Sequence, residues 1–189
     1  MDDLFFKNYH YYLLKRTFKA YLYRRFVLYP QIKKRCYGKI LDLGCGIGDF
    51  VKTTENSTGV DINKYNIEYC KENNINALWY KDSIPFKDNT FDTVLIDNVL
   101  EHIYDFEKLV HEALRVLNDK GILIIGLPPI KNFFHDEDHK VFFSRIFMRD
   151  SFFIKDIYLK EIFHVPSNSI LFKYFLHSSV WFVYSVRRI

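Results

Sequence analysis

The chain has 189 residues, 49% of them hydrophobic and 26% charged, and its formal net charge is +4. This length corresponds to one domain, or to one domain with an added arm, and the composition excludes disordered and fibrous chains. The net charge is weaker than we expect of a protein dedicated to binding nucleic acid.

The charge is distributed unevenly along the chain. Residues 1–37 carry nine basic and two acidic side chains, residues 38–126 carry nine and fifteen, and residues 127–189 carry nine and six. An acidic central segment therefore lies between two basic ends, and any functional assignment has to explain it.

The sequence does not indicate a secreted or zinc-stabilised protein. Its three cysteines, Cys36, Cys45 and Cys70, form no CxxC pair, which disfavours a zinc site and a disulfide framework. The chain begins Met-Asp-Asp, without the basic residues of a signal peptide, and no stretch of about 18 apolar residues is free of charged residues. We therefore expect a cytoplasmic protein without a transmembrane segment.

The first predicted element is a basic helix. Aromatic and leucine side chains at helical spacing predict a helix over residues 4–28, and Pro30 should end it. A basic connector over residues 32–38 follows. We interpret residues 1–37 as an N-terminal helical cap and residues 38–189 as the main domain.

From Gly38 onwards, short apolar strands alternate with helices. The predicted strands cover residues 39–43, 57–60, 77–80, 91–96 and 122–127, and the predicted helices cover residues 47–54, 63–74 and 104–117. After a long loop over 128–143, the pattern predicts helices over 144–153 and 170–177 and strands over 157–163 and 180–187. This alternation favours an α/β fold with a mainly parallel sheet.

The most informative segment is a glycine turn that follows the first strand. Residues 40–48 read Ile-Leu-Asp-Leu-Gly-Cys-Gly-Ile-Gly, and the next helix should direct the positive end of its dipole at a ligand. Asp61 ends the second strand, where a carboxylate can accept both hydroxyls of a ribose. A nicotinamide site would use the same acid, but its glycine spacing is GxGxxG and Asp42 would repel a pyrophosphate. A cationic cofactor with a ribose suits this segment better.

Four segments together resemble the class I S-adenosylmethionine-dependent methyltransferases, in particular the small type 11 group that includes ubiquinone-biosynthesis-like enzymes. These segments are ILDLGCGIG (40–48), TGVDI (58–62), KDSIPFKDNTFDTVLIDNVLEHI (81–103) and EALRVLNDKGILIIGLP (112–128). The resemblance implies a doubly wound, Rossmann-like sheet of seven strands that is mainly parallel, with an antiparallel last strand. Residues 180–187 fit that last strand.

The resemblance also implies a binding site for S-adenosyl-L-methionine. The methionine part would be held by Asp42, Gly44, Cys45 and Gly46, the ribose by Asp61 and the adenine ring by Ile62. The adenine amino group would donate a hydrogen bond to Asp82, beside Ser83 and Ile84. The methionine end and the entrance for the substrate would be lined by Asp97 and Asn98. These four acids lie at or just beyond strand ends, where ligands bind in open α/β sheets.

Three histidines are candidate general bases for an oxygen or nitrogen acceptor. His102 follows the fourth strand, and His135 and His139 lie in the loop after the fifth strand, which borders the acceptor site in relatives. The alternatives are a structural role for His102 and a solvated polar loop around the other two.

The same region of the sequence contains part of a known pattern for binding a divalent metal ion. Some relatives hold a divalent cation with a Glu-x-x-Glu-His pattern and a later histidine. Here Asn98 replaces the first glutamate, while Glu101, His102 and His139 remain. Loss of one anionic ligand weakens a site for a hard cation, so we expect none.

These observations predict a methyltransferase that uses S-adenosylmethionine to modify a small molecule, at oxygen or nitrogen. The basic N-terminal helix has several interpretations: solvated charges on a packed helix, a contact to an anionic acceptor, RNA binding, or contact with a membrane surface. The alternatives to a small-molecule methyltransferase are an RNA-modifying enzyme, a nicotinamide oxidoreductase and a non-catalytic member of the fold that binds cofactor or protein. The sequence predicts no particular oligomeric state.

Overall fold

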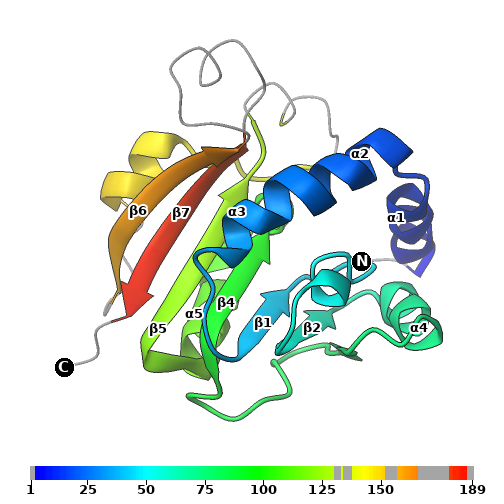
Figure 1. The fold of residues 1–189 in the computed structure, drawn as a ribbon, viewed down its shortest axis with the longest axis horizontal. Coiled ribbons are helices and arrows are strands. Elements are labelled where there is room, and N and C mark those ends of the chain that lie inside the picture. The colour runs from blue at the N-terminus through cyan, green and yellow to red at the C-terminus, as the bar shows by residue number, and fades with distance from the viewer. Residues whose placement is uncertain (1–2, 130–132, 134–137, 152–156, 166–178, 187–189) are drawn as a thin grey trace.

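A single sheet organises the part of the chain that the computed structural model describes, residues 3–129, 133, 138–151, 157–165 and 179–186 (Figure 1). Within these ranges the sheet has seven strands in the order β3-β2-β1-β4-β5-β7-β6. The strands are β1 (Ile40–Leu43), β2 (Ser57–Asp61), β3 (Ala77–Trp79), β4 (Phe91–Asp97), β5 (Leu117–Leu127), β6 (Ile157–Val165) and β7 (Ser179–Val186). β7 is antiparallel to both of its neighbours, and the pairs among β1–β5 are parallel. The predicted doubly wound sheet with an antiparallel last strand is confirmed.

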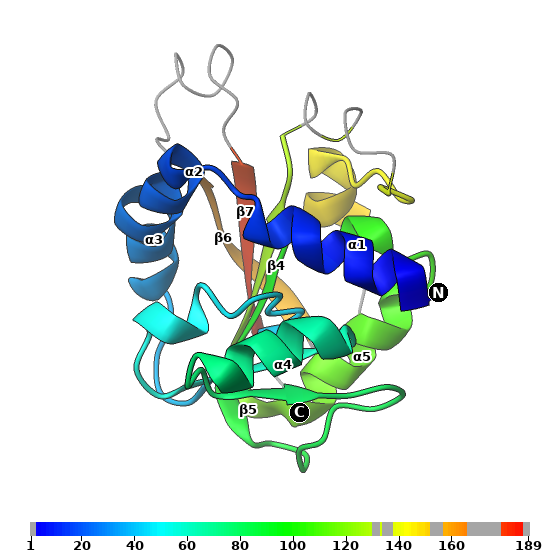
Figure 2. The ribbon, with the colours of Figure 1, turned by 90° about the vertical axis from the view of Figure 1, so that its right-hand side faces the viewer.

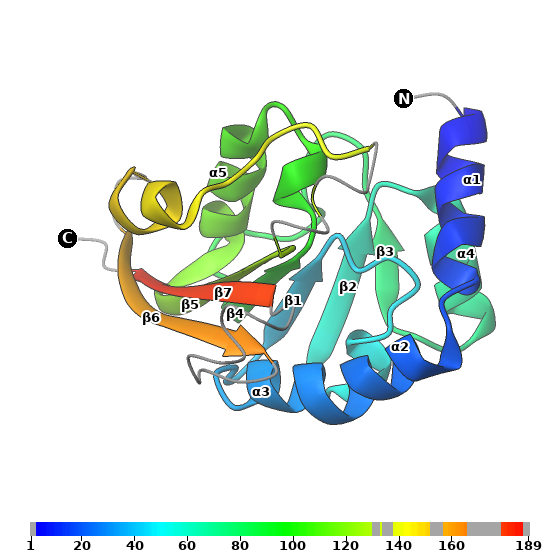
Figure 3. The same cartoon turned by 90° about the horizontal axis from the view of Figure 1, so that it is seen from above.

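The sheet is buried on both faces, as its apolar strands predict. On one face, Val94 and Ile125 pack in a cluster with Val110 of α5 (Phe106–Val116). On the other face, Leu95 packs in a cluster with Ile32 of α3 (Tyr29–Lys33). Seen from above, α5 and α3 lie on opposite sides of the sheet (Figure 3).

The N-terminal arm differs from the single helix predicted over residues 4–28. It consists of α1 (Asp3–Leu14), α2 (Phe18–Tyr23), a π-helical segment η1 (Arg24–Leu28) and α3. The break follows α1, where the Thr17 side chain accepts a hydrogen bond of 3.2 Å from Ala20 N and caps α2. The predicted single helix is therefore wrong, because a cap inside the apolar pattern starts a second helix and lets the chain change direction.

Pro30 does not end the helix, contrary to the prediction. It lies in the first turn of α3, directly after the π-helical segment, in which Tyr29 N bonds back to Arg24 O. Proline lacks an N–H group and its ring collides with the carbonyl group four residues earlier. The wider π turn before Pro30 provides the room that a regular α-helix would lack.

The helix predicted over residues 47–54 is also wrong. The structure has only the 3₁₀ turn η2 (Val51–Thr53) there, after Gly46 and Gly48, whose φ angles are 55° and 75°. Two left-handed residues in three cannot continue into an α-helix. The turn after β1 therefore lacks the helix dipole that we expected at a ligand.

The following elements agree with the predictions to within a few residues. α4 (Lys64–Glu72) is capped by Asn63 and ends at Asn73 and Asn74, the latter with a φ of 56°. The 3₁₀ turn η3 (Leu100–His102) precedes α5, and β5 begins at Leu117, before the start predicted at residue 122.

The last described helix is the π-helical segment η4 (Phe147–Ser151), within the helix predicted over residues 144–153. The helix predicted over residues 170–177 lies outside the described residues. In the described ranges, no helix is long and apolar enough to cross a membrane.

Candidate functional site

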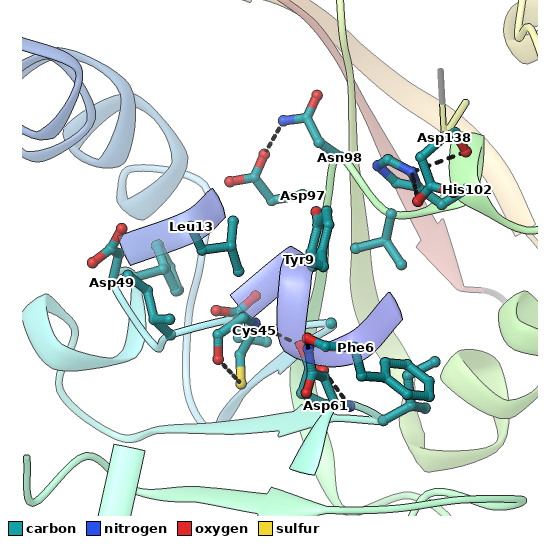
Figure 4. A pocket seen from close by; sticks show the side chains of 18 of the residues that line it. Phe6, Tyr9, Leu13, Cys45, Asp49, Asp61, Asp97, Asn98, His102 and Asp138 are labelled. Carbon is teal, nitrogen blue, oxygen red and sulfur yellow. Dashed lines mark hydrogen bonds and ion pairs between the residues drawn. The ribbon is translucent and has the colours of Figure 1, made fainter. Parts of the chain in front are cut away.

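A cavity lies beyond the carboxyl ends of β1, β2 and β4. The strand order reverses here, because β2 and β3 lie on one side of β1 and β4 and β5 lie on its other side. This is the position at which open α/β sheets bind ligands. Helix α1 runs across it (Figure 2), with Phe6, Tyr9 and Leu13 facing the cavity (Figure 4). The lining comprises Phe5, Phe6, Tyr9, Leu13, Arg16, Arg24, Tyr29, Asp42, Gly44, Cys45, Gly46, Ile47, Asp49, Phe50, Asp61, Ile62, Asn63, Tyr80, Asp97, Asn98, Val99, His102, Ile103 and Asp138.

The glycine turn forms the floor of this cavity. Gly44 N and Cys45 N both donate to Val60 O, at 2.8 and 3.0 Å, which binds the turn to β2. Gly44 has a φ of 81°, and a Cβ atom added there would lie 2.5 Å from Val99 Cγ2. The close packing of the turn therefore requires glycine at this position.

Asp61 ends β2 with both carboxylate oxygens in defined hydrogen bonds. Oδ2 accepts from Gly46 N at 2.7 Å, and Oδ1 accepts from Asn63 N at 2.7 Å. The residue is only 7% exposed. Burial raises the pKa of this carboxyl group, and the hydrogen bonds from Asn63 and Gly46 oppose that rise. Asp61 therefore joins the glycine turn and the end of β2 into one rigid unit.

Asp42 and Asp97 make the deep part of the cavity acidic. Burial raises the pKa of Asp42 well above its ordinary value, the charge of Asp97 raises it further, and Arg24 lowers it. Arg24 Nη2 lies 2.6 Å from Asp97 Oδ2, and Arg24 Nε donates to Tyr29 Oη at 2.8 Å. The arm thus supplies a cation that compensates the carboxylates of β1 and β4.

Two further contacts fix the arm over the cavity. Arg16 Nη1 lies 2.6 Å from Asp49 Oδ2, which ties the break after α1 to the segment after the glycine turn. Asn63 Nδ2 donates to Phe6 O at 2.7 Å, so α1 is also held at the start of α4. We did not predict Arg16, Arg24 or Asp49 as site residues, because their partners are more than 30 residues away and no local pattern marks them.

Two of the three histidine candidates, His102 and His139, lie close together, and His102 lines the cavity. His102 Nδ1 lies 3.2 Å from Asp138 Oδ2, and its ring meets that of Tyr9 edge-on at 6.0 Å between centroids. His139 Nδ1 lies 2.9 Å from Phe133 O, and its ring centroid lies 4.8 Å from that of His102. Asp138, which no pattern marked, therefore orients His102.

Ligand atoms of Glu101, His102 and His139 all lie within 4.8 Å of one another. His139 Nε2 lies 4.0 Å from Glu101 Oε1, and Glu101 is buried. Two imidazoles and a carboxylate are donors that divalent metals accept. The expectation that the protein uses no metal remains a prediction.

The structure brings most of the predicted cofactor residues together. Asp42, Gly44, Cys45, Gly46, Asp61, Ile62, Asp97, Asn98 and the candidate base His102 all line the cavity. Asp82 and Ser83 are exposed and lie outside its lining, and Ile84 is buried in the core with its N–H donating to Glu112 Oε2 at 3.0 Å. The roles of these three stay predictions. His135 lies outside the described residues.

Comparisons with known proteins place the chain among methyltransferases. A methyltransferase domain family matches residues 41–125, which contain the glycine turn, Asp61 and Asp97. An uncharacterised protein of Methanocaldococcus jannaschii is 33% identical over 135 residues, which cover 68% of this chain and 60% of that protein. A ubiquinone biosynthesis O-methyltransferase of Pelagibacter ubique is 32% identical over 98 residues, which cover 47% of this chain and 41% of that protein. The chain therefore spans less than two thirds of the length of these relatives.

A solved structure shares the fold over nearly the whole chain. It is described as an S-adenosylmethionine-dependent methyltransferase, possible histamine N-methyltransferase, from Thermotoga maritima, and it superposes with a TM-score of 0.69. The match covers 98% of each chain at 17% sequence identity. At this identity the likeness concerns the fold alone.

Proposed function

The chain belongs to the class I S-adenosylmethionine-dependent methyltransferases, and from this membership we propose that it transfers the methyl group of S-adenosylmethionine to a small-molecule acceptor, at oxygen or nitrogen. The main structural support for this proposal is the contact between Asp61 and the glycine turn. A buried carboxylate, Asp61, binds the glycine turn at the carboxyl edge of the sheet, within an acidic cavity. The matched domain contains both partners of this contact.

The cavity fits a cationic cofactor with a ribose better than one with phosphates. Asp42, Asp61 and Asp97 lie at its floor, and within the described residues no α-helix directly follows the glycine turn to bind a pyrophosphate. We assign the ribose hydroxyls to Asp61, the adenine ring to Ile62, and the methionine part to the turn from Gly44 to Gly46. On the same proposal Asp82, with Ser83 and Ile84, meets the adenine amino group.

The charge of the lining also bears on the acceptor. Five aspartates line the cavity against two arginines, and each arginine already pairs with an aspartate. This balance favours a neutral or cationic acceptor over the anionic one considered from the sequence. Aromatic side chains of α1 exclude water from the same space.

The bound cofactor supplies a methyl group activated by its positive sulfur, so the protein mainly has to align the acceptor and receive its proton. His102 lies at the cavity, and Asp138 holds its Nδ1 atom. We propose that His102 Nε2 takes the proton of the acceptor as the methyl group is transferred, and that Asp138 acts as a positioning residue. His135 and His139 remain candidates on the same loop.

Binding measurements test the assigned cofactor class. In isothermal titration calorimetry we expect S-adenosylmethionine and S-adenosylhomocysteine to bind with micromolar or tighter affinity, while NAD and NADP give no heat. The expectation rests on the acidic lining, which opposes a pyrophosphate. Binding of NAD with no binding of either S-adenosyl compound would contradict the proposal and support an oxidoreductase.

Replacement of His102 tests the assigned base. We expect His102→Gln to lower kcat by about 100-fold or more, because general bases contribute that much, and to change the affinity for S-adenosylhomocysteine little. The assay is release of S-adenosylhomocysteine with an acceptor selected from a panel of phenols and amines. His111→Gln, at an exposed position of α5, is the matched control. Equal activities of both variants would assign His102 a structural role.

A further inference from the structure

The outer side of the N-terminal arm exposes an unusual amount of apolar surface. Of sixteen large hydrophobic side chains that are exposed in the described residues, eight lie between Leu4 and Phe26. Phe18 is 73% exposed and Phe26 is 66% exposed. Concentrated apolar exposure of this kind marks a surface that contacts a partner or a membrane.

Three of these residues, Phe18, Tyr21 and Phe26, form a continuous row with Arg25 along α2 and η1. The rings of Phe18 and Tyr21 stack at 6.5 Å between centroids, Arg25 Nη1 donates to Tyr21 Oη at 3.0 Å, and the Arg25 guanidinium lies 5.8 Å from the centre of the Phe26 ring. The row follows the helical spacing of one face. The side chains of the two adjacent arginines point in opposite directions. Arg24 donates to Asp97 in the cavity, whereas Arg25 is exposed to solvent.

The row ends at a basic surface depression. Arg25, Phe26, Lys33 and Lys52 line it together with Thr53, Thr54 and Glu55. Lys33 Nζ donates to Thr53 O, which holds this ammonium group in place. Burial and then the charge of Arg25 lower the pKa of Lys33, so the cations here are crowded against one another. We call Phe18, Tyr21, Arg25, Phe26, Lys33 and Lys52 the aromatic–basic strip.

The arm itself carries charge of one sign, and Glu55 is the acidic side chain among the residues that line the depression. Residues 4–37 contain nine basic side chains and no acidic one. Arg16 and Arg24 pair with cavity aspartates, whereas Lys7, Lys15, Lys19 and Arg25 are exposed and contact no carboxylate within the described part of the chain. This surface is complementary to a partner that is anionic and also accepts phenylalanine rings.

We propose that the aromatic–basic strip attaches the protein to the surface of an anionic lipid bilayer. Phenylalanine rings enter the boundary between headgroups and acyl chains, tyrosine lies at headgroup level with its hydroxyl group in water, and lysine and arginine attract anionic lipid. The depression lined by Arg25, Lys33 and Lys52 receives a lipid phosphate. RNA fits less well, because two protruding phenylalanines on a convex helix offer no groove that follows a strand. The segment that contacts the bilayer also supplies Arg24 to the lining of the cavity.

Vesicle co-sedimentation of the full chain tests this proposal. We expect binding to phosphatidylcholine vesicles with about 30% phosphatidylglycerol, little binding to phosphatidylcholine alone, and a loss of at least about tenfold on raising salt from about 0.05 to 0.5 M. The double variant Phe18→Ser/Phe26→Ser and the double variant Arg25→Glu/Lys52→Glu should each weaken binding at least about tenfold. The proposal is overturned if the protein binds both vesicle types equally. It is also overturned if either double variant binds the anionic vesicles as well as the wild type does.

Matched controls distinguish binding through the strip from nonspecific binding of exposed side chains to vesicles. Tyr104 is 76% exposed outside the strip, so Tyr104→Ser tests loss of an exposed aromatic side chain, and Lys87→Glu tests charge reversal on an exposed loop. Both should bind vesicles like the wild type, and circular dichroism should show all variants folded. Binding of single-stranded RNA without vesicle binding, or a dimer in analytical ultracentrifugation that Phe26→Ser dissociates without vesicle binding, also overturns the proposal.

Discussion

Asp61→Asn should weaken the binding of S-adenosylhomocysteine by about 100-fold or more, because the carboxylate offers two charge-assisted hydrogen bonds to a ribose and an amide offers one neutral bond. The substitution also places an NH₂ group against either Gly46 N or Asn63 N, which both donate to Asp61 at 2.7 Å. A buried N–H without an acceptor costs about 1–3 kcal/mol, so the glycine turn should loosen as well. Calorimetric titration measures the affinity, and urea unfolding measures the loss of stability.

Asp92→Asn is the matched control for Asp61→Asn. Asp92 lies near the start of β4, at the opposite end of the strands from the cavity, and its Oδ2 accepts from Lys39 N at 2.8 Å. This variant loses a similar contact between a carboxylate and a backbone N–H, but it touches no residue of the cavity lining. It should lose stability and keep its affinity for S-adenosylhomocysteine. Equal affinities of the two variants would show that Asp61 acts only through the fold and would contradict its assignment to the ribose.

The central domain could be predicted from the sequence because its strands are continuous apolar runs that end in polar residues. Leu41 and Leu43, Val60, and Leu95 and Ile96 are buried where the predicted strands lie, and the acids that follow them gather at one sheet edge. Parallel strands place their carboxyl ends together, so the position of Asp61 and Asp97 needs only the correct strand ends and strand order.

The arm could be predicted less well, because its structure depends on contacts with distant residues. Helical spacing alone does not reveal the break that Thr17 caps, nor the π turn that accommodates Pro30. Arg24 reads as one of nine basic residues, although it contacts Asp97, 73 positions later. Asp138 resembles its acidic neighbours in a polar loop, and only the fold places it against His102. Tertiary partners of this kind leave no periodic signal in the sequence.

Arg24→Gln should produce the largest loss of stability among single substitutions of the basic residues in the arm. The variant leaves the Asp97 carboxylate, whose side chain is 7% exposed, without its cation at 2.6 Å. Removing one partner of a buried ion pair costs about 3–5 kcal/mol. Because the Arg24 side chain is 22% exposed, we expect about 2–4 kcal/mol, which lowers the Tm by roughly 5–15 °C for a chain of this size. Differential scanning calorimetry measures the change.

The pH dependence of this loss distinguishes a charge effect from lost packing. Arg24 lowers the pKa of Asp42, which burial raises well above its ordinary value, so removing Arg24 raises that pKa further. A raised carboxyl pKa means that the carboxyl group binds its proton more tightly in the folded state than in the unfolded chain. Stability then falls as the pH rises above the pKa that this group has in the unfolded chain. The destabilisation by Arg24→Gln should therefore be small near pH 4–5 and increase towards pH 8.

Arg16→Gln provides the comparison for Arg24→Gln at the same cavity. Its partner Asp49 is 22% exposed and Arg16 is 27% exposed, so water replaces the lost contact more effectively and the cost should be about 1 kcal/mol or less. Urea unfolding of both variants at pH 5 and pH 8 measures the two losses. A loss for Arg24→Gln that is equal at both pH values would assign Arg24 to packing against Tyr29, because that contact does not depend on carboxylate ionisation.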